Sequence, residues 1–94
     1  MKIKSLIWLD EIVDKLAGKH HVNQDDVREV LLNRPHFRFV EKGQRPKENV
    51  YAALGQTESG RYLIVFFVRK KDGRAIILSA RDMTSAERKK YEET

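Results

Sequence analysis

Five arginines recur in the second half of the chain, near the ends of predicted strands and at the start of the last predicted helix. They are Arg61, Arg69, Arg74, Arg81 and Arg88. Guanidinium groups suit phosphate because they keep their charge and donate two parallel hydrogen bonds. RNA can be cleaved without a metal ion when its own 2′-hydroxyl is the nucleophile, provided that cations hold the charge developing on the phosphate. These arginines are candidates for that role, although strand-end arginines are more often solvated charges or salt-bridge partners.

Such a reaction also needs a base and an acid to move protons. Tyr91, His20, His21 and Glu87 are the candidates, and the sequence alone does not choose among them. Each candidate ring also has a structural interpretation. A tyrosine can dock a helix through its ring, and histidines that follow a helix end can be charge partners of that end.

The net charge of +5 is distributed unevenly. Residues 1–33 have five Lys or Arg and six Asp or Glu, whereas residues 34–94 have fourteen and eight. A basic half suits a nucleic-acid backbone, and it is also typical of an ordinary surface that aids solubility. The predicted RNA-binding residues in this half are Arg74, Arg88, Lys70 and Lys71.

The sequence contains no motif typical of a cofactor site. His20 and His21 are adjacent and His36 belongs to another predicted element, so no spacing brings metal ligands together. The chain has no cysteine, which excludes disulfides and thiolate metal sites. Nucleotide-binding and serine-hydrolase patterns are missing as well. We therefore expect neither a metal ion nor another cofactor.

Length and hydropathy predict one domain over residues 1–94. The longest apolar stretch, residues 62–68, has the length of a strand, whereas a membrane helix needs roughly 18 residues. The N-terminus starts basic, but its apolar part is too short for a signal peptide. We expect a cytoplasmic protein that makes no contact with a membrane.

Two helices are predicted in the first third of the chain. Apolar residues recur at helical spacing over residues 9–16, with Asp10 as the candidate N-cap and Gly18 as the end. Asn23 is the candidate N-cap of a second helix, which Pro35 terminates.

From residue 36 onward the apolar pattern becomes that of strands. The predicted strands span residues 37–40, 50–54, 61–69 and 74–81, and in one alternative a short strand over residues 4–8 precedes the helices. The stretch 61–69 is apolar on both faces, which is typical of a central strand. The polar, basic residues 43–47 form a loop that either touches RNA or only connects two strands.

The last predicted helix starts at the capping box Thr84-x-x-Glu87 and runs to about Glu93. It has almost no apolar face, so it is stable only when it docks. The order of elements predicts an α+β fold with two N-terminal helices, a three- to four-stranded antiparallel sheet and a short C-terminal helix.

The predicted hairpin at Asp72-Gly73 limits which arginines can meet. A two-residue turn places Arg81 on the opposite face of the sheet from Arg61 and Arg69. A four-residue turn keeps that separation and sets Arg61 opposite Asp82 as a salt-bridge partner. Arg61 and Arg81 therefore share a site only if a bulge or a strand end reorients one of them.

Three stretches of the chain together resemble the BrnT family of toxins, within the RelE-like toxin superfamily. Residues 19–22 (Lys-His-His-Val) resemble the family's Lys-His-Gly-Val segment. Residues 55–65 resemble its Gly-x-Thr and Gly-Arg-x-Leu-x-Val strand pair. Residues 77–91 resemble its Ser-Ala-Arg, Glu-Arg and Tyr ending, which is the most specific of the three. The match covers about residues 8–93.

The resemblance implies a RelE-like fold, a ribonuclease that inhibits translation, and an antitoxin encoded beside it. It implies Arg61, Arg81 and Arg69 as site residues, with Arg88 and Tyr91 from the last helix. Together with the chemistry above, the predicted catalytic residues are Arg61, Arg81, Arg69, Tyr91 and His20. The expected partners are a cognate antitoxin, RNA, and DNA only indirectly through the antitoxin.

Two alternatives remain open at this point. A degenerate toxin would keep the fold and bind an antitoxin or nucleic acid without cleaving it. The chain could also be a structural partner in a DNA-bound repressor complex, where a basic toxin surface would suit an acidic, amphipathic antitoxin segment.

Overall fold

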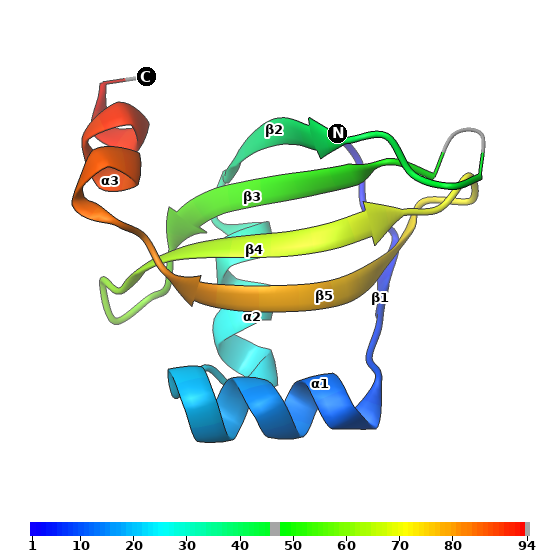
Figure 1. Ribbon diagram of the computed structural model, residues 1–94. Coiled ribbons are helices and arrows are strands. Elements are labelled where there is room, and N and C mark those ends of the chain that lie inside the picture. The colour runs from blue at the N-terminus through cyan, green and yellow to red at the C-terminus, as the bar shows by residue number, and fades with distance from the viewer. Residues whose placement is uncertain (46–47, 94) are drawn as a thin grey trace.

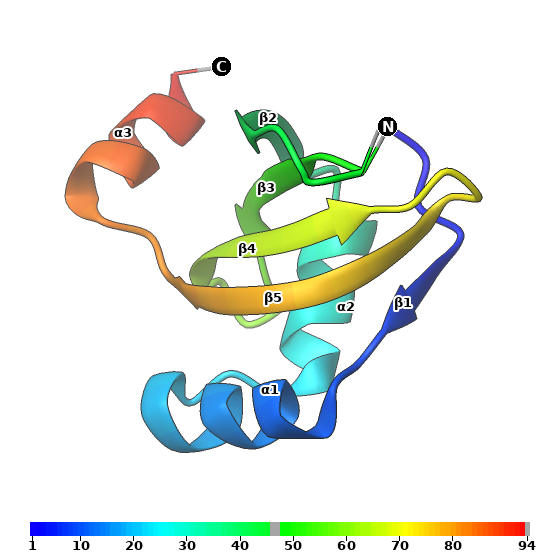
Figure 2. The same cartoon turned by 45° about the vertical axis from the view of Figure 1, so that its right-hand side comes forward.

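The fold is α+β, with a five-stranded sheet between helices (Figure 1); the computed structural model describes residues 1–45 and 48–93. The elements in chain order are β1 (Ser5–Ile7), α1 (Asp10–Lys15), the π-helical segment η1 (Leu16–His20), α2 (Gln24–Leu32), β2 (His36–Glu41), β3 (Val50–Gln56), β4 (Tyr62–Arg69), β5 (Arg74–Asp82) and α3 (Ser85–Glu92). Turning the molecule by 45° leaves α1 below the sheet and α3 above one end of it (Figure 2).

The sheet has the strand order β1-β5-β4-β3-β2. Its antiparallel part, β2 to β5, follows the chain as a meander, as predicted. The prediction of three or four antiparallel strands is wrong at the other edge, because β1 adds a parallel strand beside β5, with Ser5 opposite Arg74. The alternative strand over residues 4–8 corresponds to β1. Three partly exposed residues are too few for an alternating pattern to emerge from the sequence.

The first helix differs from its predicted boundaries at both ends. Leu9 is the N-cap and forms no side-chain hydrogen bond, whereas Asp10 lies inside the first turn, where its charge favours the helix dipole. Gly18 does not end the helix, because η1 continues to His20. A glycine costs a helix only about 1 kcal/mol, so it does not force a stop. The chain reverses instead at His21, which has a left-handed φ of 53°.

Both later helices start as predicted, each with a complete capping box. The Asn23 side chain accepts from the Asp26 amide at 2.8 Å, and the Asp26 carboxylate accepts from the Asn23 amide at 3.1 Å. At α3, the Glu87 carboxylate accepts from the Thr84 amide at 2.9 Å, while the Thr84 hydroxyl accepts from the Glu87 amide at 3.2 Å. These bonds satisfy amides that a helix start leaves unpaired.

The main core lies between the sheet and the helices α1, η1 and α2. Its buried residues are Leu16, Val22, Val27, Val30, Ala53, Leu63, Val65, Phe67, Ala75, Ile77 and Ala80. A smaller cluster of Ala52, Leu54 and Ile64 is buried on the other face, where Phe66, Met83 and Tyr91 pack against it. Strand β4 therefore contributes buried side chains to both faces, which confirms its prediction as a central strand.

The β4–β5 hairpin has the predicted register beyond its turn, but the turn itself is longer than two residues. Ile64 lies opposite Arg81 and Phe66 opposite Ser79, as a two-residue turn requires. The turn is longer, since the Lys70 amide donates to the Arg74 carbonyl at 2.8 Å and Gly73 has a φ of 93°. A register shift next to Phe66 compensates for the extra turn residue.

Two further predictions concern the loop between β2 and β3 and the length of the helices. The predicted basic loop over residues 43–47 is only partly placed, because residues 46 and 47 lie outside the described part of the chain. Among the described helices, none is long and apolar enough to cross a membrane.

The burial of β4 on both faces predicts that replacing two phenylalanines will have very different effects on stability. Phe67 is fully buried, whereas Phe39 in β2 is 56% exposed. We expect Phe67→Ala to lower the free energy of unfolding by about 3–5 kcal/mol, because it removes apolar contacts and leaves a cavity. The control Phe39→Ala should cost about 1 kcal/mol or less. Urea denaturation followed by circular dichroism measures both, and equal losses would contradict the core described here.

Candidate functional site

The predicted site residues fall into three separate places. Arg61 and His20 lie at one end of the sheet, on the side of α1. Arg81, Arg88 and Tyr91 gather on the opposite face, at α3. Arg69, Lys70, Lys71 and Arg74 surround the β4–β5 turn. Arg61 immediately precedes β4 and Arg69 is its last residue, so the two lie about 26 Å apart at about 3.3 Å per residue, and one phosphate cannot contact both.

Arg61 joins three segments of the chain. Its guanidinium donates to the Asp82 carboxylate at 2.8 and 3.2 Å, to the His20 carbonyl at 2.8 Å, and to the His21 carbonyl. The hydrogen bond from Arg61 lowers the pKa of Asp82, and the same bond raises the pKa of Arg61. Arg61 thus ties the end of η1 to β5 and has most of its donors occupied. His20 enters this contact through its backbone carbonyl.

The cations at the far end are also engaged within the chain. Lys70 pairs with Glu48 at 3.2 Å and Arg74 with Asp72 at 2.8 Å. Arg74 also lowers the pKa of Asp72, mainly through its backbone amide. The Arg69 side chain donates to the Lys2 carbonyl at 3.5 Å, next to the parallel edge strand. Lys71 is exposed.

The third group lies on the sheet face that carries α3, which we call the α3 face. Arg81 in β5 is the register partner of Ile64 in β4. Ile64 is the partner of Leu54 in β3, and Leu54 is the partner of His36 in β2. Directly opposed residues point to the same face, so these four form one row across four strands. Its ends, Arg81 and His36, are about 14 Å apart along the sheet.

Helix α3 spans this row. The Glu87 carboxylate accepts two hydrogen bonds from Arg81, at 2.8 and 3.0 Å. Tyr91, four residues later, places its ring 4.7 Å from the His36 ring. Residues four apart share one side of a helix, so Glu87 and Tyr91 both face the sheet. The helix thereby brings a phenol and an imidazole together at one end and an arginine at the other.

Aromatic rings of the α3 face hold the two arginines in place. Arg88 lies over the Tyr62 ring at 3.9 Å, and Arg81 lies near the Phe66 ring at 5.6 Å. The Tyr62 and Tyr91 rings meet edge to face at 6.0 Å. Stacking of this kind orients a guanidinium plane and leaves its edge available for an anion.

A cleft of about 160 Å³ separates β2 from α3. Its lining residues are His36, Phe37, Arg38, Leu54, Lys90 and Tyr91. Two of these side chains are cations, and two carry groups that can transfer protons. His36, Arg38 and Lys90 were not among the predicted site residues. The alternation of β2 indicates that His36 and Arg38 share a face, but only the path of α3 shows that this face is part of a cleft.

The ionisation of Glu87 limits its chemical role. Its hydrogen bonds with Arg81, the largest cause, lower the pKa of Glu87 to about 2. Glu87 is therefore ionised near neutral pH and does not donate a proton there. It serves as the anion that orients Arg81 and caps α3.

Within residues 1–45 and 48–93, no group of three or more His, Asp or Glu side chains is placed to share a metal ion. The polar groups of the α3 face are instead mainly cations, a phenol and an imidazole. Such a set is suited to binding an anion and moving protons beside it.

Comparison with known proteins identifies the family. The sequence model described as "Ribonuclease toxin, BrnT, of type II toxin-antitoxin system" matches residues 8–87. The crystal structure of the Brucella abortus ribonuclease toxin BrnT is similar in fold, with a TM-score of 0.60 and 14% sequence identity over 86% of this chain and 97% of that chain. A search of curated proteins gave no match. The chain belongs to the BrnT family of ribonuclease toxins, which confirms the resemblance inferred from its three sequence stretches.

The contacts of Arg61 predict a structural effect of its removal. We expect Arg61→Ala to lower the free energy of unfolding by about 1–3 kcal/mol, because Asp82 and two carbonyls lose a charged donor. Arg28→Ala is the matched control, since Arg28 forms an exposed pair with Asp25 worth about 0–1 kcal/mol. Thermal and urea unfolding measure both variants. An Arg61→Ala protein that is as stable as the wild type would contradict the role of Arg61 in holding η1 against β5.

The low pKa of Glu87 predicts a pH-dependent contribution to stability. Because the folded pKa of about 2 lies below the usual 4.5, ionised Glu87 favours the folded state. That contribution is complete above pH 4.5 and is lost as the pH falls toward 2. The difference in melting temperature between the wild type and Glu87→Gln should therefore shrink over this range. Glu92→Gln, at an exposed pair with Arg88, should differ little from the wild type at any pH.

Proposed function

We propose that this chain is a toxin that cleaves RNA without a metal ion, stops translation in the cytoplasm, and is held inactive by an antitoxin protein. Membership of the BrnT family supports the class of protein. The observation that carries the proposed site is the α3 face, where Arg81, Arg88, Tyr91 and His36 gather around one helix.

The reaction we propose is transfer of the phosphodiester to the adjacent 2′-oxygen. A base removes the 2′-hydroxyl proton, the 2′-oxygen bonds to phosphorus, and the bond to the 5′-oxygen breaks. An acid protonates the leaving 5′-oxygen. The products are a 2′,3′-cyclic phosphate and a 5′-hydroxyl end, so atoms and charge balance without a cofactor.

We assign proton transfer to His36 and Tyr91. Their rings are 4.7 Å apart, so both can reach one phosphodiester group in the cleft between β2 and α3. Glu87 is unsuited to the acid role because its pKa is about 2. The phenol and the imidazole are two groups beside this cleft that can exchange a proton with an oxygen of RNA.

We assign binding of the phosphate to the cations of the same face. Arg81 and Arg88 are held by aromatic rings and by carboxylates of α3, and the Arg81 side chain stays 36% exposed. Arg38 and Lys90 line the cleft itself. Cations fixed before the reaction stabilise the charge that develops on the phosphate oxygens.

The other predicted residues take different roles in this proposal. Arg61 and the His20 backbone hold η1 against the sheet, and Arg69 supports the N-terminal segment. Lys70, Lys71 and Arg74 stay predicted contacts for RNA that extends along the sheet toward the β4–β5 turn.

A second candidate function is binding without cleavage. It is favoured by the carboxylates Glu87 and Glu92, which already occupy Arg81 and Arg88 and would have to share them with a phosphate. In this case the chain would bind RNA or an antitoxin and leave the phosphodiester intact.

Cleavage of a short RNA by the purified chain in EDTA tests the proposal. We expect Arg81→Ala, Tyr91→Phe and His36→Gln each to lower the rate by about 10²-fold or more, because each removes one group of the reaction. Lys89→Ala, at an exposed residue of α3 that does not line the cleft, is the control and should keep the wild-type rate.

Two substrate controls separate the candidates. A single 2′-deoxy nucleotide at the cleaved position should abolish cleavage, and the wild-type product should end in a 2′,3′-cyclic phosphate. Folded wild-type protein that binds this RNA and leaves it intact would decide for the second candidate. In a cell-free system, the wild type should stop protein synthesis and Arg81→Ala should not.

A further inference from the structure

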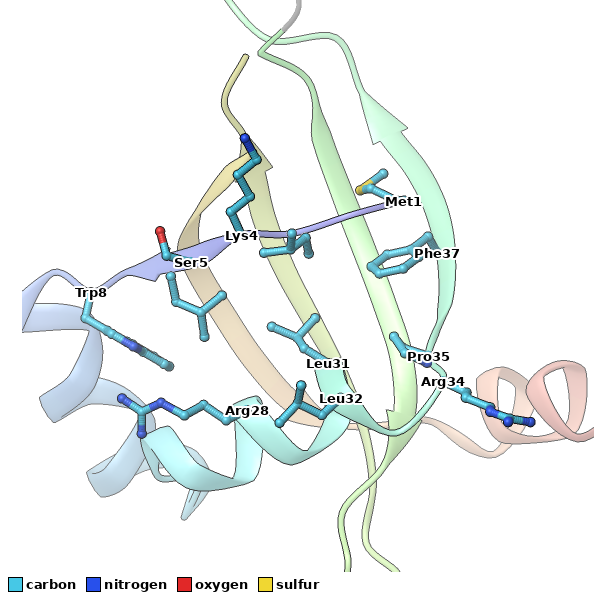
Figure 3. A pocket seen from close by; sticks show the side chains of 12 residues that line it. Met1, Lys4, Ser5, Trp8, Arg28, Leu31, Leu32, Arg34, Pro35 and Phe37 are labelled. Atoms are coloured by element: carbon cyan, nitrogen blue, oxygen red, sulfur yellow. The ribbon is translucent and has the colours of Figure 1, made fainter. Parts of the chain in front are cut away.

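A groove of about 630 Å³ lies on the side of the sheet opposite the α3 face (Figure 3). Its walls are the N-terminal segment with β1 on one side and α2 with the start of β2 on the other. The lining residues are Met1, Ile3, Lys4, Ser5, Leu6, Trp8, Arg28, Leu31, Leu32, Arg34, Pro35 and Phe37. Of these residues, Phe37 also lines the cleft between β2 and α3, and the others lie outside the proposed RNA site.

The groove has an apolar floor that reaches the surface. Leu31 and Phe37 pack against the core at its base, whereas Leu32 is 85% exposed and Met1 is 49% exposed at its rim. Figure 3 shows Leu31 and Leu32 on neighbouring positions of α2 and Met1 beside Phe37. Single exposed leucines are ordinary, but an exposed leucine continuous with an apolar groove marks a surface that a partner can cover.

The charged residues of the groove are all cations. Among the residues that the structure describes, Lys4, Arg28 and Arg34 line it, and no acidic side chain does. Arg28 pairs with Asp25 at 2.9 Å outside the groove, and neither Lys4 nor Arg34 forms an ion pair within the described residues. A partner that fills the apolar floor would therefore meet three cations, and carboxylates on that partner would match them.

We propose that this groove is the docking site for an acidic, amphipathic segment of the antitoxin. The inference rests on the proposed toxin function, which supplies such a partner. The segment would place apolar side chains on Leu31, Leu32 and Phe37 and carboxylates beside Arg28 and Arg34. A second copy of this chain fits less well, because its net charge of +5 would repel the cations of the groove.

The location of the groove has a consequence for the complex. Because the groove and the α3 face lie on opposite sides of the sheet, the segment in the groove anchors the antitoxin without covering His36 or Tyr91. Substitutions in the groove should then weaken binding of the antitoxin without changing the rate of RNA cleavage.

The test uses the full chain and, as the probe, the small protein encoded by the gene next to that of this chain. We expect Leu32→Glu and Arg34→Glu each to weaken binding of that protein by about tenfold or more in calorimetry. Leu78→Glu, at an exposed leucine of β5, and Lys15→Glu, at an exposed cation of α1, are the matched controls and should bind like the wild type.

Hydrogen exchange of the complex locates the contact. Amides within residues 1–8 and 28–37 should gain protection when the partner binds. Protection confined to other segments, equal losses in groove and control variants, or no binding of the neighbouring protein would each overturn the proposal.

RNA cleavage separates this inference from the proposed function. Free Leu32→Glu and Arg34→Glu should cut RNA at the wild-type rate, and co-expression of the neighbouring protein should no longer protect cells from them. If the wild type fails to cut RNA but the groove variants still lose binding, the proposed ribonuclease function fails and the docking site stands. If cleavage occurs and the groove variants bind normally, the docking site alone fails.

Discussion

Strand β4 is the part of the structure on which the rest depends, because it must be buried on both faces. Leu63, Val65 and Phe67 point to one side and Ile64 points to the other, and all are buried. The first side is covered by α1, η1 and α2 and becomes the main core. The second side has a smaller apolar cluster, so a short helix with few apolar residues is enough to cover one end of it.

This unequal burial explains why polar chemistry gathers on the α3 face. Helix α3 docks without an apolar stripe. The Tyr91 ring lies against His36 and Tyr62, Glu87 pairs with Arg81, and Arg88 lies over the Tyr62 ring. Polar and charged side chains therefore remain at the surface between the helix and the sheet. The side chains that hold α3 against the sheet are also the side chains that the proposed reaction uses. The stability of α3 and the geometry of the site therefore depend on each other.

The pleat of the sheet divides the arginines by role. Arg61 lies on the side of α1 and η1 and joins η1 to Asp82. Arg81 lies on the α3 face beside Glu87. The register shift between Phe66 and Phe67 does not bring them together, since Arg81 stays opposite Ile64. The arginines therefore differ in role although their sequence positions look alike. Arg61 stabilises the fold on one face of the sheet, and Arg81 on the other face binds RNA in our proposal. The groove beside α2 adds a further basic surface, which contains neither Arg61 nor Arg81.

The sequence by itself determined the elements whose signals are local. The N-cap Asn23, the capping box at Thr84 and the two-sided apolar pattern of β4 each depend on residues close together in the chain, and each was found where the sequence predicted it. The family resemblance is confirmed by the family model, which matches residues 8–87. The end of the first helix was not among these elements, because Gly18 was its predicted end and the chain reverses instead at the left-handed His21. The tertiary structure alone decided that β1 adds a parallel edge and that α3 crosses to β2. Both are long-range pairings: three residues are too few to show an alternating pattern, and a helix without an apolar face carries no local signal of what it will cover.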